Sequence, residues 1–445
     1  MRLGGPLFTD LYELTMAASY HSLKMTSDAT FSLFIRNYPP KRNYFVAAGL
    51  EGLLRGLEEY RFIPEELDFL SSTGLFDDDF LDYLRGFKFS GKIHALKEGT
   101  IFFIDEPILE VNAPIIEAQL LETLILNTIG FQTLIASKAA RCVEAAQGRP
   151  LIDFSSRRTQ GMDAALKVAR SAYLVGFEGT SNVLAGKTYG IPSSGTMAHS
   201  FVMAFDDEKD AFVAFSEQFK KHSIFLIDTY DTVTGAKKAA DVAVQMKQNG
   251  NSLIGVRLDS GDFVKLSNQV RRILDDAGLS QVKIFATGSF DEYRIEKVLS
   301  KGAQIDAFGV GTRMGVSSDA PYVDIVYKMV RFRGRDVRKL SPHKKTLAGE
   351  KQIFRRKDRF GFFKEDILGL RDDRVNGTRK LLKKVMESGK VIIPYPSLAQ
   401  LRKHFNRERS QLPAEFRSLS KRAVYPVKIS PRLCRLQGME STKNH

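Results

Sequence analysis

The sequence predicts an α/β fold organised around a parallel β/α barrel, with an N-terminal α/β domain and a smaller basic C-terminal region. Two observations predict the barrel: short apolar runs recur along the middle of the chain, and segments with helical periodicity separate them. Strand–helix–strand units repeated at roughly 20–30 residues produce parallel strands joined by right-handed crossovers. The expected domains are residues 1–135, 136–330 and 331–445.

The barrel strands are expected where apolar residues cluster between polar ones. The regular part of the series consists of the runs Ser223–Ile227, Leu253–Val256, Val282–Ala286 and Ile305–Val310. Helical periodicity lies between them, at Val233–Gln248, Phe263–Ala277 and Asp291–Leu299. Two earlier runs resemble members of the same series, Leu151–Phe154 and Tyr173–Phe177. A further short strand can be placed near Ile191. Six or more such units favour a closed barrel over an open sheet.

The N-terminal part has a different pattern. Gly91–Ala113 is rich in β-branched residues and turns, and Glu98-Gly99 is a hairpin signal within it. Pro114–Ala146 then predicts a long helical stretch that is broken near Gly130. This combination predicts a separate α/β domain before the barrel.

The C-terminal region carries the basic excess of the chain. Residues 331–445 hold 31 Lys and Arg against 11 Asp and Glu, a net charge of +20, whereas residues 1–330 hold 35 against 41, a net charge of −6. Phe354–Phe363 resembles a hairpin. The basic excess fits a nucleic-acid footprint, a solvated surface or one side of an anionic substrate cleft. Since no zinc finger, aromatic strand motif or clean basic helix accompanies it, nucleic-acid binding is the less favoured interpretation.

The bulk composition indicates a globular protein of a reducing compartment. The chain has 445 residues, 43% of them hydrophobic, which predicts two or three domains with a large core. Its two cysteines, Cys142 and Cys434, lie far apart and argue against a disulfide framework. No apolar stretch approaches the ~20 residues of a membrane span, and the N-terminus lacks the pattern of a signal peptide. A cytoplasmic location is expected.

The candidate chemistry lies where the predicted strands end, because the active sites of parallel barrels form at that face. The polar residues there are Ser155–Arg158, Glu178–Asn182, Gly195–His199, Asp228, Thr229, Asp231, Arg257, Asp259–Asp262, Thr287–Ser289 and Gly309–Thr312. Glycine with Ser or Thr at two successive late strand ends predicts a phosphate cradle of backbone N–H groups.

Other side chains at these ends suit a phosphorylated sugar, a second anion and Mg²⁺. Arg157 and Arg257 can each grip a phosphate or carboxylate with two hydrogen bonds. Asp259 and Asp262 supply oxygens that Mg²⁺ prefers. For Asp262 the alternative, a helix N-cap, is equally favoured. Arg158 is equally consistent with a solvated side chain.

His199 follows the turn Gly195-Thr196 and can project an imidazole from a loop. Imidazole titrates near neutral pH and can act as a nucleophile. A lone loop histidine is more often a plain surface or core residue. Its position among strand ends suited to phosphate makes His199 a candidate catalytic residue.

Several motifs together resemble nicotinate phosphoribosyltransferases. They are Thr9–Met16 (TDLYELTM), Asp153–Arg158 (DFSSRR), Gly179–Asn182 (GTSN), Gly195–Ser200 (GTMAHS) and Gly255–Asp262 (GVRLDSGD). The resemblance runs in order from about residue 6 to 330. It implies a type II phosphoribosyltransferase with an incomplete or irregular β/α barrel, which is usually a homodimer with its active site at the subunit interface.

The resemblance implies a reaction and its partners. Nicotinate and 5-phosphoribosyl 1-diphosphate give nicotinate mononucleotide and diphosphate, a step of NAD biosynthesis and salvage. ATP is the co-substrate, Mg²⁺ the metal, and a phosphorylated histidine at the position of His199 couples ATP hydrolysis to transfer. Such an enzyme is both a ligase and a glycosyltransferase.

The resemblance also assigns roles by position. Tyr12, Phe154, Thr196 and Arg257 match positions that bind nicotinate, Tyr12 from the partner subunit. The phosphoribosyl and phosphate positions are Arg157, Ser181, Gly288, Ser289, Gly311 and Thr312. Enzymes that use nicotinamide tend to carry Asp near the position of Ser181, so an uncharged serine favours the acid as substrate.

Two alternatives remain beside nicotinate transfer. The first is nicotinamide or quinolinate phosphoribosyl transfer, although quinolinate enzymes are expected to be shorter and to have a more basic pocket. The second belongs to another class, a basic nucleic-acid-binding protein that retains a barrel, whose binding would depend steeply on salt.

Overall fold

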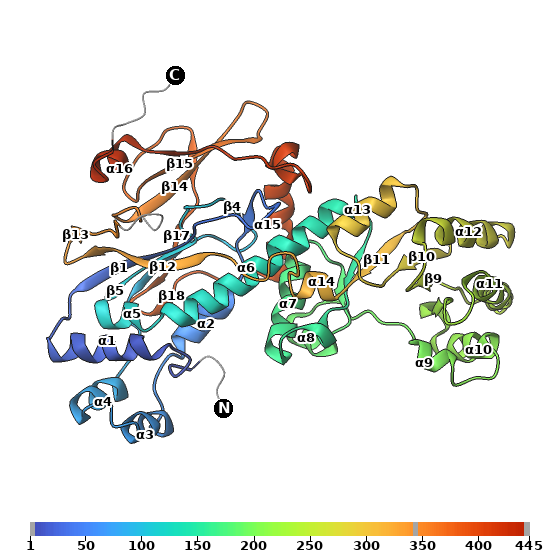
Figure 1. Ribbon diagram of the computed structural model, residues 1–445, viewed down its shortest axis with the longest axis horizontal. Coiled ribbons are helices and arrows are strands. Elements are labelled where there is room, and N and C mark those ends of the chain that lie inside the picture. The colour runs from blue at the N-terminus through green and yellow to red at the C-terminus, as the bar shows by residue number, and fades with distance from the viewer. Residues whose placement is uncertain (1–4, 341–345, 440–445) are drawn as a thin grey trace. The chain divides into compact units, whose positions relative to one another are not determined.

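The computed structural model describes residues 5–340 and 346–439. It divides into two compact units. One unit contains Met1–Ser137 and Tyr322–His445, and the other contains Lys138–Pro321 (Figure 1). The basic C-terminal region thus belongs to the same compact unit as the N-terminal part.

The unit Lys138–Pro321 is built on a six-stranded parallel sheet. Its strands are β6 (Leu151–Asp153), β7 (Gly179–Thr180), β8 (Ile224–Leu226), β9 (Gly255–Leu258), β10 (Lys283–Ala286) and β11 (Ala307–Val310). Their order is β7-β6-β11-β10-β9-β8, and every neighbouring pair is parallel. Within the described residues β7 and β8 are the sheet edges. The sheet is therefore an open half-barrel, as the family resemblance implied, and not the closed barrel that the strand count favoured.

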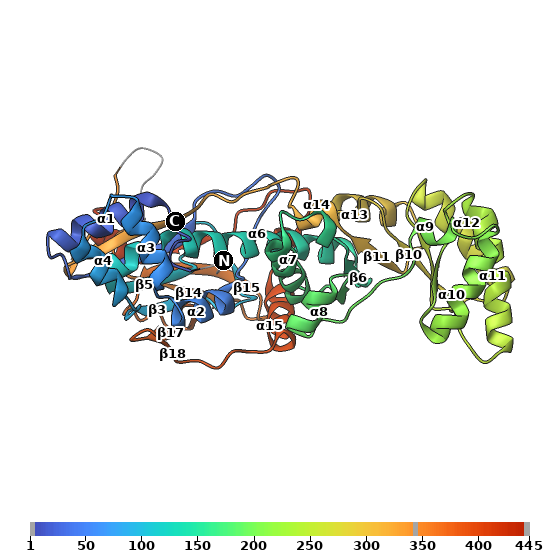
Figure 2. The ribbon, with the colours of Figure 1, turned by 90° about the horizontal axis from the view of Figure 1, so that it is seen from below.

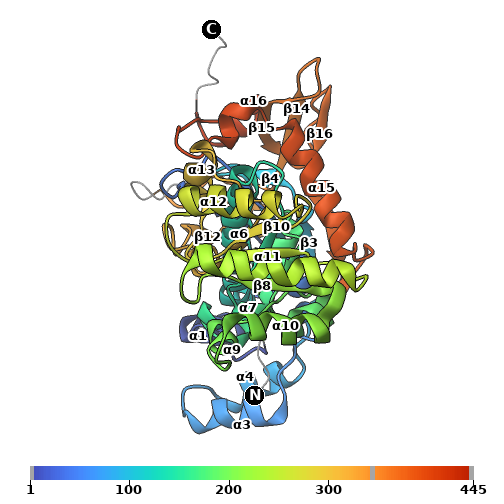
Figure 3. The same ribbon diagram turned by 90° about the vertical axis from the view of Figure 1, so that its right-hand side faces the viewer.

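Helices connect these strands. They are α7 (Met162–Leu174), α8 (Val183–Tyr189), α9 (His199–Val202), α10 (Glu208–Phe219), α11 (Thr232–Gln248), α12 (Phe263–Asp276), α13 (Glu292–Ser300) and α14 (Thr312–Gly315), with 3₁₀ turns at Ser156–Arg158 and Lys220–His222. α10, α11 and α12 pack in sequence beside one another (Figures 2 and 3). Carboxylates that follow the strands cap three of the helices: Asp231, Asp262 and Asp291 accept from backbone N–H groups of α11, α12 and α13.

One predicted strand of this unit is wrong. Tyr173–Phe177 is not a strand, because α7 continues to Leu174 and the chain then turns through Gly176, whose φ is +121°. The strand that follows is β7, at Gly179–Thr180. A short apolar run buries the last turn of a helix as well as it buries a strand, so periodicity could not separate the two. Near Ile191 there is a single parallel bridge between Thr180 and Ser193.

The other unit contains a seven-stranded sheet in the order β13-β12-β1-β5-β3-β17-β18, a four-stranded sheet β16-β14-β15-β19 and the pair β2-β4. Its strands are β1 (Asp28–Ile35), β2 (Phe45–Val46), β3 (Lys92–Ala95), β4 (Ile101–Phe102), β5 (Leu109–Pro114), β12 (Ile325–Phe332), β13 (Arg335–Asp336), β14 (Lys351–Lys357), β15 (Phe363–Leu370), β16 (Thr378–Lys380), β17 (Lys383–Glu387), β18 (Lys390–Val391) and β19 (Val427–Ile429). β1 pairs antiparallel with both β5 and β12. That pairing joins the N-terminal part to the segment after the half-barrel.

The helices of this unit are α1 (Leu11–Ser22), α2 (Leu50–Glu58), α3 (Pro64–Ser72), α4 (Asp78–Arg85), α5 (Ile115–Gln119), α6 (Glu122–Ala145), α15 (Leu398–Gln411) and α16 (Pro431–Leu436), with a 3₁₀ turn at Ala414–Arg417. The end of α6 extends past Ser137 into the range of the other unit. Contrary to the expectation from the sequence, the stretch Ile115–Ala145 is apolar and long enough to span a membrane, but 78% of its most apolar window is buried within the protein. It therefore has the character of a core helix.

Three local expectations for this unit have clear outcomes. The hairpin Phe354–Phe363 is confirmed, as β14 and β15 pair antiparallel. The turn at Glu98-Gly99 does not join a hairpin, because β3 pairs with β5 and β4 with β2. Instead the buried Glu98 carboxylate accepts from the N–H of Gly49, which precedes α2.

The long helical stretch is interrupted between Gln119 and Glu122, and Gly130 lies inside α6. A Cβ at Gly130 would lie 3.2 Å from a methyl group of Ile325, so this glycine permits close packing of α6 against β12. The expected break near Gly130 is therefore wrong, because packing and not a turn requires the glycine.

Candidate active site

The carboxyl ends of the half-barrel strands carry the predicted site residues of the unit Lys138–Pro321. Parallel strands place these ends along one edge of the sheet. The residues there are Phe154, Arg157, Ser181, Thr196, His199, Arg257, Asp259, Asp262, Gly288, Ser289, Gly311 and Thr312. Tyr12 belongs to the other unit, on α1, and 45% of the residue is exposed. Burial of its hydroxyl and the nearby Glu122 raise the pKa of Tyr12.

Asp153 holds the ends of β6 and β7 together. Its buried carboxylate accepts hydrogen bonds from the N–H of Ser155 at 2.9 Å, the hydroxyl of Ser155 at 2.5 Å and the hydroxyl of Thr180 at 2.8 Å. Burial raises the pKa of the Asp153 carboxyl. The Asp153 carbonyl accepts from the N–H of Ser181 at 2.8 Å. The sequence motif contained Asp153, but nothing in the residue pattern assigned it this positioning role.

Phe154 lies against a glycine of the neighbouring strand. A Cβ on Gly309 would lie 2.6 Å from two ring carbons of Phe154, and the N–H of Phe154 donates to the carbonyl of Val310 at 2.8 Å. The absence of a side chain at Gly309 therefore gives the ring its place at the strand end. A half-exposed aromatic face in this position can stack against a flat ligand ring.

Arg257 and Thr196, which the resemblance assigned to the same ligand, do come together. Nη1 of Arg257 donates to the hydroxyl of Thr196, and Nη2 donates to the carbonyl of Met197 at 2.9 Å. Burial lowers the pKa of the Arg257 guanidinium, and its buried Nε has no hydrogen-bond partner among the described residues. The guanidinium thus holds the loop that leads to His199.

His199 is the first residue of α9 and stands between two polar groups from other strand ends. Its Nδ1 lies 3.1 Å from the hydroxyl oxygen of Thr229, and its Nε2 lies 3.9 Å from Oδ2 of Asp259. The imidazole is 40% exposed. A neutral ring that donates from Nδ1 to Thr229 keeps a free electron pair on Nε2.

The aspartates of the site differ in which of their carboxylate oxygens already accept hydrogen bonds. Asp228 is buried; its Oδ2 accepts from the N–H of Asp259 and the hydroxyl of Ser260, each at 2.8 Å, while its Oδ1 has no hydrogen-bond partner in the described chain. Asp259 accepts from the hydroxyl of Thr287. Asp262 caps α12, accepting from Val264 and Lys265 N–H groups at 3.0 and 3.2 Å.

No group of three or more His, Cys, Asp and Glu side chains in residues 5–340 and 346–439 is arranged to hold a metal ion. In enzymes that act on phosphates, Mg²⁺ usually takes one or two carboxylates together with oxygens of the bound substrate.

The two expected phosphate loops follow β10 and β11. The backbone N–H groups of Gly288, Ser289, Gly311 and Thr312 have no hydrogen-bond acceptor within the described residues. Gly288 has a φ of +96°, and a Cβ there would overlap the carbonyl of Asp259. Ser289 has a φ of +56°, which is uncommon for a residue with a side chain. Four free donors on neighbouring strand ends suit a phosphate group.

Arg157 and Ser181 do not join these clusters. Arg157 is exposed in the 3₁₀ turn after β6, and Ser181 is exposed after β7. Arg158 is exposed beside Arg157, as expected for a solvated side chain.

Glu208, at the start of α10, is a buried carboxyl that the sequence reasoning missed. Only 3% of the residue is exposed, and its Oε1 has no hydrogen-bond partner among the described residues. A Cβ at Gly235 would lie 3.2 Å from that oxygen. Burial raises the pKa of Glu208 to about 7. A glutamate in the first turn of a helix looks like a favourable dipole partner in sequence, so no pattern signalled its burial.

This shift predicts a pH dependence of stability. Between about pH 4.5 and about pH 7 the folded Glu208 binds a proton that the unfolded chain has released, so the free energy of unfolding falls as pH rises through this window. As the pH rises from 5 to 8, we expect the melting temperature of Glu208→Gln to fall less than that of the wild type. Glu217→Gln, an exposed glutamate on the same helix, is the control. Parallel melting curves for Glu208→Gln and wild type across this range would contradict the assignment.

The half-barrel and its site define the class of the protein. An open parallel sheet with helix caps, a paired arginine, an imidazole and free backbone donors at its carboxyl edge belongs to an α/β enzyme suited to anionic substrates. Residues 7–130 match the nicotinate phosphoribosyltransferase N-terminal domain, residues 150–366 match the nicotinate phosphoribosyltransferase family, and residues 371–437 match its C-terminal domain. The chain belongs to the nicotinate phosphoribosyltransferase family.

Individual members of this family are similar to this chain over nearly its whole length. A nicotinate phosphoribosyltransferase of Mycobacterium tuberculosis is 45% identical, with 99% of this chain and 96% of the relative covered. One of Bacillus subtilis is 37% identical, with 95% and 92% covered. The crystal structure of human nicotinic acid phosphoribosyltransferase is similar with a TM-score of 0.87 at 29% identity, covering 97% of this chain and 99% of that one.

Proposed function

We propose that this enzyme joins nicotinate to 5-phosphoribosyl 1-diphosphate, giving nicotinate mononucleotide and diphosphate, and that ATP hydrolysis is coupled through His199. One observation carries the proposal: Asp259 lies beside both the imidazole of His199 and the phosphate loop that contains Gly288. Its Oδ2 lies 3.9 Å from Nε2 of His199, and its backbone carbonyl abuts Gly288. The negative charge of a phosphorylated imidazole would therefore lie close to a phosphoribosyl group bound at this loop.

The coupling step would use the tautomer of His199 that carries its proton on Nδ1. With the proton on Nδ1 directed to Thr229, Nε2 attacks the γ-phosphorus of ATP; the Nε2–P bond forms, the bond to the bridging oxygen breaks, and ADP leaves. Water later cleaves the Nε2–P bond and releases phosphate. Until it is hydrolysed, the phosphoryl group on His199 adds negative charge beside the phosphate loops.

The transfer step breaks the bond between ribose C1 and the diphosphate oxygen and forms a bond from C1 to the pyridine nitrogen of nicotinate. Because the ribosyl centre becomes cation-like, the step needs charge stabilisation more than a strong base. The cradle residues Gly288, Ser289, Gly311 and Thr312 would fix the 5′-phosphate through their N–H groups. Mg²⁺, when bound, would neutralise charge on the departing diphosphate. The buried, unpartnered Oδ1 of Asp228 and the carboxylate of Asp259 fit such an ion, and Asp262 accepts its two cap hydrogen bonds at Oδ1 alone.

Nicotinate would lie on Phe154, with its carboxylate at Arg257 and Thr196. Tyr12 would complete this site from a partner subunit in a homodimer, and Arg157 and Ser181 would contact the phosphoribosyl substrate. The enzyme would work in NAD salvage in the cytoplasm. The pairing of Arg257 with Thr196 supports the nicotinate site, and the exposure of Tyr12 supports its contact with a partner subunit.

A substrate comparison tests the proposal. Purified protein is assayed with nicotinate, nicotinamide and quinolinate, each with 5-phosphoribosyl 1-diphosphate and Mg²⁺, in the presence and absence of ATP. We expect nucleotide formation from nicotinate, stimulated by ATP, and phosphoprotein after incubation with γ-labelled ATP. Turnover of nicotinamide or quinolinate in place of nicotinate would overturn the substrate assignment.

Replacing Arg257 by lysine should weaken nicotinate binding. A lysine cannot keep the contacts to Thr196 and Met197 while pairing with a carboxylate, because it lacks the planar fork. Loss of one charged hydrogen bond is worth about 1.5–3 kcal/mol, so KM for nicotinate should rise about 10- to 100-fold.

KM for 5-phosphoribosyl 1-diphosphate should change much less in this variant. Arg271→Lys is the matched control, since Arg271 also binds backbone carbonyls but at the opposite end of β10. An unchanged KM for nicotinate in Arg257→Lys would place the carboxylate elsewhere.

A further inference from the structure

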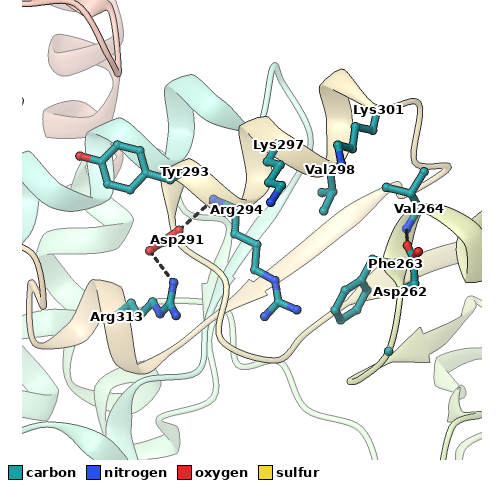
Figure 4. A pocket seen from close by; sticks show the side chains of 11 residues that line it. Asp262, Phe263, Val264, Asp291, Tyr293, Arg294, Lys297, Val298, Lys301 and Arg313 are labelled. Atoms are coloured by element: carbon teal, nitrogen blue, oxygen red, sulfur yellow. Dashed lines mark hydrogen bonds and ion pairs between the residues drawn. The ribbon is translucent and has the colours of Figure 1, made fainter.

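Arg294 on α13 packs against two aromatic rings that contact each other, beside the first phosphate loop. Its guanidinium carbon lies 5.0 Å from the ring centroid of Phe263 and 5.0 Å from that of Phe290. The two rings are themselves 4.9 Å apart at 64°. Figure 4 shows Arg294 beside Phe263 in a pocket of about 470 Å³. A guanidinium packed in this way has little freedom to move.

The same guanidinium fixes one peptide group of the loop. Nη1 of Arg294 donates to the carbonyl oxygen of Gly288 at 2.6 Å. The peptide between Gly288 and Ser289 is trans, so its N–H points opposite to its C=O. The N–H of Ser289 is therefore directed away from Arg294, and it has no acceptor among the described residues.

This peptide would not be expected to hold its orientation without support. Gly288 and Ser289 both have positive φ, and the value of +56° at Ser289 costs energy for a residue with a side chain. The carbonyl of Asp259 closes off Gly288 on one side, since a Cβ there would overlap it. Arg294 supplies the hydrogen bond that compensates for the strained turn.

The neighbouring Asp291 links this loop to the second one. Its buried carboxylate caps α13 through the N–H of Arg294 at 2.9 Å, and its other oxygen lies 3.1 Å from Nη1 of Arg313. Arg313 directly follows Thr312 of the second phosphate loop. Figure 4 shows both contacts as dashed lines. Arg294 is thus linked to the first phosphate loop directly and to the second through Asp291 and Arg313.

We propose that Arg294 is a positioning residue for the 5′-phosphate of the phosphoribosyl substrate, and this inference rests on the proposed function. By holding the Gly288 carbonyl, Arg294 turns the N–H of Ser289 toward the phosphate. It acts through the backbone and does not itself touch the substrate.

The test separates phosphate binding from stability. Arg294→Met removes the hydrogen bond to Gly288, while Arg294→Lys keeps the charge and a donor. Ribose 5-phosphate serves as a competitor that presents the 5′-phosphate alone. We expect Arg294→Met to weaken its inhibition, and to raise KM for 5-phosphoribosyl 1-diphosphate, by about tenfold, the lower end of the range for one charged hydrogen bond. KM for nicotinate should stay within about twofold, and Arg294→Lys should lie between Arg294→Met and wild type.

Arg271→Met is the matched control. It loses hydrogen bonds of the same kind, at 2.8 and 3.1 Å to the carbonyls of Val282 and Leu279, at the other end of β10. Equal weakening in both methionine variants, or unchanged inhibition in Arg294→Met, would overturn the positioning role and leave the proposed function standing. A wild type that turns over no nicotinate, or that ribose 5-phosphate does not inhibit, would overturn the proposed function and this inference together.

Discussion

His199→Ala should abolish ATP turnover and phosphoprotein formation while leaving a slower, ATP-independent transfer. The variant removes Nε2, the atom that would carry the phosphoryl group, but leaves Arg257 and the free N–H groups of the phosphate loops in place. Loss of a nucleophile typically costs on the order of 10³-fold or more in rate. ATP hydrolysis should therefore fall to background, as measured by release of labelled phosphate.

Two further variants define what the histidine does. His222→Ala removes an exposed histidine of the same unit and should leave ATP turnover unchanged. Thr229→Val removes the partner of Nδ1 at 3.1 Å, so it should slow phosphorylation without abolishing it, by about tenfold. ATP hydrolysis that persists at the wild-type rate in His199→Ala would refute the phosphohistidine assignment.

The half-barrel could be predicted because each of its strand–helix units is formed by residues that are close together in the sequence. Each strand from β8 to β11 lies within a predicted apolar run or overlaps it, and α11, α12 and α13 follow the predicted periodicity closely. Their caps, such as Asp231 and Asp291, come from the residue type that favours that position. Tyr173–Phe177 failed because a buried helix end and a strand share the same short apolar signature.

The candidate site was predicted in part for the same reason. Strand ends of a parallel sheet lie at one edge by topology, so the sequence alone was enough to expect Thr196, His199, Arg257 and Asp259 together. Contacts that depend on side-chain direction could not be expected. The role of Arg294 depends on two rings from different segments that stack on one guanidinium, and nothing in sequence spacing specifies that.

The unit with the basic region was least predictable, because its pairings join distant segments. Register between β1 and β12 connects Phe34 with Val326, a contact that no local pattern encodes. Some of the arginines after residue 331 are paired with carboxylates. Arg371 contacts the buried Glu110, and Arg356 pairs with Glu365. These two arginines are therefore committed to the fold.

Arg355→Met should destabilise this unit by about 3–5 kcal/mol, the usual cost of removing one partner of a buried ion pair. The Arg355 side chain is fully buried; Nε and Nη2 donate to Asp366 at 2.9 and 2.6 Å, and Nη1 donates to Glu408 at 3.1 Å. The ring of Phe363 lies 4.2 Å from its guanidinium carbon. Methionine fills the volume but leaves two buried carboxylates without this cation.

Arg356→Met on the same strand provides the comparison. Its side chain is 37% exposed, and its partner Glu365 also pairs with Lys428 at 2.9 Å, so its loss should cost no more than about 1 kcal/mol. Burial and the charge of Asp366 raise the pKa of the nearby Glu106 carboxyl and Arg355 opposes this shift, so the pKa of Glu106 should rise further in Arg355→Met. Protonation then relieves the uncompensated charge, so the difference in unfolding free energy between wild type and Arg355→Met should shrink as pH falls. Denaturant unfolding at several pH values measures this difference, and equal effects of the two arginine variants would show that Arg355 is not the centre of the charge cluster.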